Sequence, residues 1–153
     1  MKIFVMRHGD AAYKDNDRVL SDKGIKESTE VAVQICAKYK INKIFASPKT
    51  RAQQTATVVI NHLNKDLMIE TLTELSPDGD PITVRSFIDA TCSENDIVLL
   101  VSHIPLVQEL IYELTSHHEF GPDFVTSSAL LLDYNGIIAT PEHFFSPTQE
   151  RWY

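Results

Sequence analysis

Positively charged residues are the scarcer kind in this 153-residue chain, which has 14 Lys and Arg residues against 21 Asp and Glu residues and a formal net charge of -7. A surface of this sign repels the phosphate backbone of nucleic acids, so we expect no nucleic-acid partner. The same field repels small anions at long range. A phosphate site in this chain must therefore be a local pocket of basic residues.

The chain also has few cysteines and no long apolar run. Its two cysteines, Cys36 and Cys92, have neither the spacing of metal ligands nor a disulfide framework, which predicts free thiols in a reducing cytoplasm and no metal site. No apolar stretch approaches the length of a membrane span, and the N-terminus leads straight into a strand without a signal-peptide pattern. We therefore expect a cytoplasmic monomer with no membrane partner.

The hydrophobic pattern predicts one α/β domain over residues 1–153. Short apolar runs predict strands at 2–6, 43–46, 66–70, 97–101, 129–132 and 141–145, and helical spacing predicts helices at 21–39, 48–63, from 81 onward and at 104–114. This alternation is typical of a three-layer α/β/α sandwich with a mostly parallel central sheet. The Asn135-Gly136 turn predicts an antiparallel edge strand, Ser21 and Ser47 are predicted helix N-caps, and residues 9–20 are predicted to be a loop.

Polar residues of one chemical kind follow three of the predicted strands. Arg7, His8 and Gly9 follow the first strand, Ser47 and Arg51 the second, and Ser102 and His103 the strand at 97–101. Parallel strands place their carboxyl ends at one edge of a sheet, so we expect these groups to converge. Glycine permits backbone conformations closed to other residues, and we expect Gly9 to present His8 outward.

Two guanidinium groups and two imidazoles beside a helix N-terminus describe a site for a doubly charged tetrahedral anion. The sequence offers no Cys or Ser nucleophile with a nearby base and no acidic cluster for magnesium, which leaves the His8 imidazole as the attacking group. Taken alone, Arg-His-Gly is a weak signal and favours a basic strand end with a solvated histidine. The combination of three segments favours the catalytic interpretation.

In this combination the sequence resembles the histidine phosphatase superfamily, the phosphoglycerate mutase-like group. The three segments that carry the resemblance are Arg7-His8-Gly9, Ser47-Pro48-x-x-Arg51-Ala52-x-Gln54-Thr55 and Ser102-His103. The chain is also similar to the SixA-type protein phosphohistidine phosphatases in Arg18-x-Leu20-Ser21-x-x-Gly24, Glu74-Leu75-Ser76-Pro77-x-Gly79-Asp80, His103-x-Pro105-Leu106-Val107 and Ser127-Ser128-Ala129. Val19 departs from that pattern, which usually has Pro there.

The resemblance implies that His8 takes up the phosphoryl group and that Arg7, Arg51 and His103 bind its oxygens, without any cofactor. It also suggests substrate contacts at Gly9 and Ser128, although a turn role suits Ser128 equally well. Glu74, in the segment Leu72-Thr73-Glu74, matches the position where many family phosphatases hold their proton donor. Glu74 serving only as a cap or surface partner, Asp10 acting as the acid, and no acid at all are the alternatives.

The spacing between Arg51 and His103 bears on the substrate. Mutases and ester phosphatases of the superfamily usually insert a helical cap here, but these two residues are only 52 positions apart and predicted sandwich elements fill the interval. An open, uncapped site favours hydrolysis over mutase chemistry. The expected function is hydrolysis of phosphohistidine on a phosphotransfer, phosphorelay or phosphotransferase-system protein. A small-molecule phosphomonoester phosphatase and a non-catalytic phosphate- or phosphohistidine-binding module are the alternatives.

Overall fold

The parallel half of the central sheet carries the chain segments that matter for function. The computed structural model describes residues 1–63, 66–147 and 150–153, which form a sheet of seven strands in the order β5-β4-β6-β1-β7-β8-β9. Its parallel strands are β1 (Lys2–Arg7), β4 (Lys43–Ala46), β5 (Ile69–Thr71) and β6 (Ile97–Ser102). The strands β1 and β6 lie side by side near the centre, as their two-sided apolar pattern predicts.

The other edge of the sheet is antiparallel. It consists of β7 (Ala129–Tyr134), which pairs with β1, followed by β8 (Ala139–Phe145) and β9 (Glu150–Trp152). The Asn135 side chain accepts hydrogen bonds from the amides of Ile137 and Ile138 and so closes the predicted turn between β7 and β8. The predicted fold class is confirmed, and the antiparallel edge is broader than the single strand expected.

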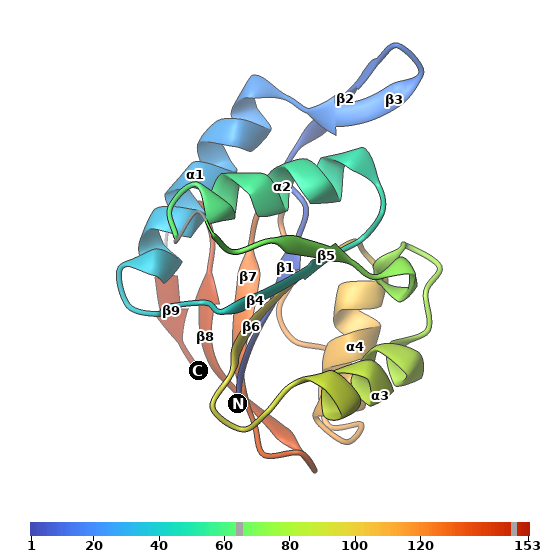
Figure 1. Ribbon diagram of the computed structural model, residues 1–153, viewed down its shortest axis with the longest axis vertical. Coiled ribbons are helices and arrows are strands. Elements are labelled where there is room, and N and C mark those ends of the chain that lie inside the picture. Colours follow the sequence, from blue (N-terminus) through green and yellow to red (C-terminus); the bar gives the residue numbers. More distant parts are fainter. Residues whose placement is uncertain (64–65, 148–149) are drawn as a thin grey trace.

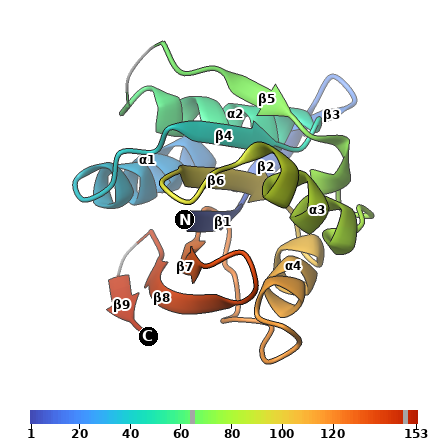
Figure 2. The ribbon, with the colours of Figure 1, turned by 60° about the horizontal axis from the view of Figure 1, so that its bottom comes forward.

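Helices cover both faces of the sheet and enclose two separate hydrophobic cores (Figures 1 and 2). The helices are α1 (Asp22–Cys36), α2 (Thr50–Ile60), α3 (Pro81–Thr91) and α4 (Leu106–Leu114). Alternate residues of β1 point to opposite faces. Phe4 and Met6 pack with α1 and α2, whereas Ile3 and Val5 pack with α3 and α4. The three-layer arrangement follows from this alternation.

The capping predictions have different outcomes at the two serines. The Ser21 hydroxyl accepts a hydrogen bond from the Gly24 amide and caps α1, as predicted. At α2 the prediction is wrong, because the helix begins at Thr50 after Lys49, which provides no side-chain cap. The buried Ser47 side chain instead contacts the Lys49 amide and the His103 ring.

The segment 9–20 is a β-hairpin and not the predicted loop. It comprises β2 (Ala11–Lys14) and β3 (Asp17–Leu20), and Asp15 and Asn16 at its tip both have positive φ angles, as a two-residue hairpin turn of the primed type requires. Figure 1 shows the hairpin at the end of the molecule opposite both termini. Bonds from the Thr50 hydroxyl to Asp17 (2.5 Å) and from the Leu20 amide to Gln54 (2.7 Å) fix it against α2.

The chain between Arg51 and His103 belongs to the sandwich itself. After α2 it forms β5, a short 3₁₀ helix η1 (Thr73–Leu75), α3 and β6. Among the described residues of this interval, no further helix or strand is left to form a separate cap. In the part of the chain that the structure describes, no helix combines the length and apolarity needed to cross a membrane.

Candidate active site

The carboxyl ends of three parallel strands meet at one edge of the sheet, as predicted. The His8 amide donates to the Ser102 carbonyl (2.9 Å), and the Ser47 amide donates to the Val101 carbonyl (3.0 Å), which ties the ends of β1, β6 and β4 together. The imidazole rings of His8 and His103 have centroids 5.0 Å apart. The strand topology therefore brings both histidines into one site.

The His8 side chain is buried, with an exposed fraction of 5%, and the prediction that it is presented outward is wrong. Its Nδ1 lies 2.7 Å from the Gly9 carbonyl oxygen. A carbonyl oxygen can only accept, so Nδ1 carries the proton and Nε2 keeps a lone pair. Within the described residues Nε2 makes no hydrogen bond, which leaves it available for attack on phosphorus.

Gly9 does not have the unusual φ angle expected of it, since positive-φ glycines are found only at Gly121 and Gly136 among the described residues, but side chains crowd it. A Cβ at position 9 would lie 2.7 Å from the Ser28 hydroxyl and 2.9 Å from Leu20 Cδ2. The Gly9 amide donates to the Thr55 hydroxyl, which itself donates to the Arg51 carbonyl. The hydroxyl of Thr55 therefore links the His8 loop to the helix that carries Arg51.

Three groups around His8 have buried nitrogens without a partner. Arg7 Nε, Arg51 Nε and His103 Nδ1 are inaccessible to solvent and lack a hydrogen bond within the described residues. Arg7 is oriented by a bond from Nη1 to the Phe124 carbonyl (2.8 Å), and His103 by contact of its Nε2 with the Ser47 hydroxyl (2.8 Å). Buried unpaired donors are costly, and a phosphoryl oxygen would satisfy these three where the side chains covering them move aside.

Burial and positive charge keep both imidazoles neutral. Burial lowers the pKa of His8 to about 4, and the charges of Arg51, Arg7 and Arg18 act in the same direction, while the bond to Gly9 opposes them. Burial, the His8 ring and the charges of Arg51, Lys49 and Arg18 lower the pKa of His103 to about 3. At neutral pH the His8 ring is therefore neutral, so the nucleophilic role predicted for it would need no base to deprotonate it.

These lowered pKa values predict acid sensitivity of the fold. As pH falls from 6.5 to about 4, the unfolded chain protonates its histidines while His8 and His103 stay neutral, so unfolding takes up protons and stability falls. The expected loss of unfolding free energy is on the order of a few kcal/mol by pH 4. Urea unfolding of wild-type and His8→Gln protein at pH 7 and pH 4.5 measures it. The variant should lose less stability than the wild type, and equal losses would contradict the assignment.

The structure gives both candidate acids a structural contact without testing their catalytic roles. Glu74 lies in η1, and its Oε2 accepts a hydrogen bond from the Asp80 amide (2.7 Å) at the start of α3. Asp10 Oδ2 accepts from the Ser21 hydroxyl (2.6 Å) beside the N-terminus of α1. Both contacts are of the kind expected for residues that fix loops, and the role of either carboxyl as an acid stays a prediction.

Ser128 and Gly9 have internal partners for the groups that would contact a substrate. The fully buried Ser128 hydroxyl donates to the Val125 carbonyl (2.6 Å), while the Ser128 carbonyl accepts from the Arg7 amide (3.0 Å). The Gly9 amide is likewise bonded to Thr55. Their positions next to Arg7 and His8 are as expected, and their binding roles stay predictions.

Arg18 is a member of the site that sequence reasoning did not assign. It lies on β3, and its charge lowers the pKa values of His8, His103, Arg7 and Arg51, which shows that it acts electrostatically on the whole group. Its signal in the sequence was the match at Arg18-x-Leu20-Ser21. The role was missed because residues 9–20 were interpreted as a loop, and only the hairpin brings Arg18 over α2.

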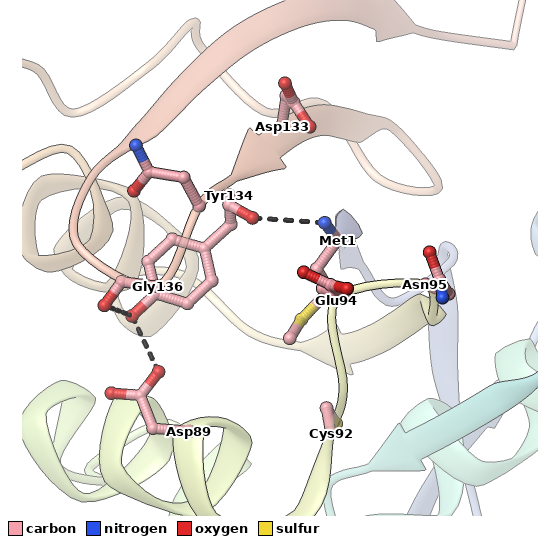
Figure 3. Close-up of a pocket in the computed structure, with 9 residues that line it drawn as sticks. Met1, Asp89, Cys92, Glu94, Asn95, Asp133, Tyr134 and Gly136 are labelled. Atoms are coloured by element: carbon pink, nitrogen blue, oxygen red, sulfur yellow. Dashed lines mark hydrogen bonds between the residues drawn. The ribbon is translucent and has the colours of Figure 1, made fainter.

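A second cavity lies at the amino end of β1 and is unsuited to phosphate (Figure 3). Its volume is about 630 Å³, and its lining contains Asp89, Glu94 and Asp133 but no arginine, lysine or histidine. The Tyr134 hydroxyl donates to Asp89 (2.7 Å), and the Met1 amino group donates to the Tyr134 carbonyl (3.1 Å). Three carboxylates outnumber its one cationic group, the Met1 ammonium, so this cavity is a poor site for an anion.

Comparisons with known proteins agree with this geometry. Residues 3–76 match the model of the histidine phosphatase superfamily (branch 1). The chain is 38% identical over 143 residues to the phosphohistidine phosphatase SixA of Escherichia coli (strain K12), covering 89% of this chain and 88% of that protein. The chain therefore belongs to the histidine phosphatase superfamily and is a hydrolase of that group.

Within the superfamily the similarity is to SixA. A SixA homolog of Haemophilus influenzae (strain ATCC 51907 / DSM 11121 / KW20 / Rd) is 31% identical over 126 residues, covering 74% of this chain and 77% of that protein. The structure of the protein histidine phosphatase SixA complexed with tungstate superposes with a TM-score of 0.86 at 37% identity, covering 97% of this chain and 98% of that one. The resemblance inferred from the motifs is confirmed.

Proposed function

We propose that this chain hydrolyses phosphohistidine on a protein, through a covalent phosphohistidine intermediate on His8. The observation that carries the proposal is the state of the His8 ring. Its Nδ1 proton is held by the Gly9 carbonyl, the centroid of the His103 ring lies 5.0 Å from that of His8, and the charges of Arg51 and Arg7 act on the ring. A neutral nucleophile facing an anion cradle suits phosphoryl transfer, in which the transition-state charge lies on the equatorial oxygens.

In the first step, His8 Nε2 forms a bond to phosphorus while the bond from phosphorus to the substrate imidazole breaks. The electron pair of that bond leaves with the substrate nitrogen. The guanidinium groups of Arg7 and Arg51 and the His103 ring hold the three phosphoryl oxygens. Because His8 is already neutral, no protein base has to remove a proton before attack.

In the second step, water attacks the phosphoryl group on His8, inorganic phosphate leaves, and the neutral ring is restored.

The leaving group of the first step needs little help from an acid. The substrate imidazole can be protonated on its second nitrogen near neutrality (unperturbed pKa about 6.5), so it departs as a neutral ring without a strong acid. An alkoxide leaving group needs a proton from the protein. Glu74 or Asp10 would supply it, and both carboxyls are held in structural hydrogen bonds.

The surroundings of the site support a protein substrate. Exposed apolar side chains occur in three segments that adjoin or influence residues of the site: Tyr13 on β2 is 79% exposed, Val125 52% and Ile104 37%. Ile104 follows His103, Val125 follows the Phe124 carbonyl that binds Arg7, and the Tyr13 side chain influences the pKa of Arg51. An uncapped site with exposed apolar side chains in such segments can accept a phosphohistidine that projects from a folded phosphotransfer domain or phosphotransferase-system protein.

The proposal includes a cytoplasmic location and a single domain over residues 1–153. Cys36 and Cys92 are free thiols, and burial raises the pKa of both, that of Cys36 to about 11. Thiols that stay protonated at neutral pH are poor nucleophiles, so neither cysteine competes with His8. The relatives named SixA are phosphohistidine phosphatases, which agrees with the substrate proposed here.

A substrate panel tests the proposal. Phosphate release from a phosphorylated histidine phosphotransfer domain is compared with release from a small phosphoramidate and from an alkyl phosphomonoester. We expect kcat/KM to rank in that order, with the phosphoramidate at least about a hundredfold above the ester because the ester needs acid catalysis. Comparable turnover of the phosphoramidate and the ester would contradict the leaving-group argument. Preference for the ester would favour a small-molecule phosphatase.

A further inference from the structure

The buried hydroxyl of Ser47 contacts the His103 ring and has no assigned role in the reaction. Ser47 follows β4 and is completely buried. Its Oγ lies 2.8 Å from His103 Nε2 and 3.2 Å from the Lys49 amide nitrogen. The Ser47 carbonyl accepts from the Gln53 side chain (2.9 Å), and its amide donates to Val101 (3.0 Å), so the backbone is held from both sides. Ser47 therefore has a fixed position and two contacts for its hydroxyl.

The proton of that hydroxyl has one acceptor. The Lys49 amide can only donate, so Ser47 Oγ accepts there. If Oγ–H donates to Nε2, the hydroxyl is fully satisfied and the His103 proton resides on Nδ1. If Nε2–H donates to Oγ instead, the buried hydroxyl proton has no acceptor and Nδ1 has no donor. The first arrangement leaves one buried group unpaired and the second leaves two, so the first is favoured.

From this accounting we propose that Ser47 is a positioning residue that holds His103 in the tautomer with its proton on Nδ1. Nδ1 is buried and has no partner in the described residues. In this tautomer it donates to a phosphoryl oxygen, whereas in the other it would turn a lone pair toward a negatively charged oxygen. The inference rests on the proposed function, because it assigns His103 to a bound phosphoryl group.

The tautomer matters because His103 is neutral. Burial keeps the pKa of this imidazole near 3, so at neutral pH the ring carries a single proton. A protonated ring would offer donors at both nitrogens and would need no selection. A neutral ring needs a hydrogen-bond partner at one nitrogen to decide which nitrogen donates at the other. Ser47 provides that partner, 56 positions away in the sequence.

Nitrogen-15 NMR of the His103 ring tests the inference without any turnover. In the wild type at pH 7 we expect the Nδ1 shift of a protonated nitrogen and the Nε2 shift of an unprotonated one, with the resonances assigned by their loss in His103→Gln. In Ser47→Ala we expect the two tautomers to mix, and in Ser47→Thr, which keeps the hydroxyl, we expect the wild-type pattern. Protonation of wild-type His103 on Nε2, or an unchanged tautomer in Ser47→Ala, overturns the inference.

Anion binding and kinetics give a second readout. Affinity for tungstate and kcat/KM for a small phosphoramidate should both fall about tenfold in Ser47→Ala, the effect of a misplaced hydrogen bond to a charged group, and Ser47→Thr should restore them. The matched control is Ser102→Ala, which removes another fully buried hydroxyl, bonded to the Leu75 carbonyl and directly before His103. The control should keep the wild-type tautomer.

The controls separate the failure of this inference from the failure of the proposed function. Equal losses of tungstate affinity in Ser47→Ala and Ser102→Ala, with the same tautomer in both, would show a merely structural effect and overturn the inference. If Ser47→Ala does not fold, the inference is still tested by nitrogen-15 NMR of the wild type and of Ser47→Thr, both of which should carry the His103 proton on Nδ1. Absence of phosphohistidine turnover would contradict the proposed function while leaving the tautomer measurement valid.

Discussion

Replacing His8 with alanine is expected to lower kcat at least about 10⁴-fold, because the proposed reaction loses its nucleophile. His103 cannot substitute, since its Nε2 contacts Ser47 and its Nδ1 is the proposed donor to the phosphoryl group. Single-turnover release of phosphate from a phosphorylated histidine phosphotransfer domain measures the loss. Tungstate should still bind to the variant, because Arg7, Arg51 and His103 remain.

Rapid quenching identifies the residue that takes up the phosphoryl group. Wild-type protein mixed with a labelled phosphoramidate should yield an acid-labile, alkali-stable phosphoprotein, and His8→Ala should yield none. His62→Ala is the matched control, because His62 is an exposed histidine at the end of α2, with Nδ1 bonded to the Val58 carbonyl. Label in His8→Ala, or full activity without His8, would exclude the covalent mechanism.

The sandwich could be predicted from sequence because its central strands bury both faces. In β1, the alternating side chains Ile3 and Phe4 enter different hydrophobic cores, so the whole run is apolar. The same holds for β6. Once these strands are parallel, the convergence of Arg7, His8 and His103 follows from topology alone, and their side chains do lie at one sheet edge.

Features that depend on distant contacts could not be predicted in this way. The hairpin β2–β3 has short strands without a regular alternation of apolar and polar residues, and bonds of Asp17 and Leu20 to α2 hold it in place. Gly9 was expected to provide an unusual backbone angle, but its φ is not positive and it is instead crowded by the side chains of Ser28 and Leu20. Both features arise from packing between segments that a local pattern does not encode.

The contacts of Ser47 and the burial of His8 could not be predicted from the sequence either. Ser47 looked like a helix cap because Ser-Pro before a helix is typical of one. The strand β4 instead directs its hydroxyl to His103, and the helix starts two residues later than Pro48. The burial of His8, and therefore its low pKa, also required the assembled fold.

Replacing Arg51 is expected to have the second largest effect. Arg51 lies in the first turn of α2, and its Nε is buried without a partner in the described chain. A guanidinium group offers a planar fork that matches two phosphoryl oxygens, whereas lysine offers a point charge. We expect kcat/KM to fall about 10²-fold in Arg51→Lys and about 10³-fold in Arg51→Ala.

Comparing the two Arg51 variants separates the contribution of the planar guanidinium geometry from that of the positive charge. Tungstate affinity should fall further in Arg51→Ala than in Arg51→Lys, because lysine keeps the attraction and loses the second hydrogen bond. Arg85→Lys is the matched control, since Arg85 on α3 bonds the Glu113 and Ile137 carbonyls and stacks over Tyr134, beside the acidic cavity at the other end of the sheet. Its kcat/KM should equal that of the wild type. If kcat/KM of Arg51→Ala stays within threefold of that of Arg85→Lys, Arg51 does not hold the transferred group and is not part of the proposed anion site around His8.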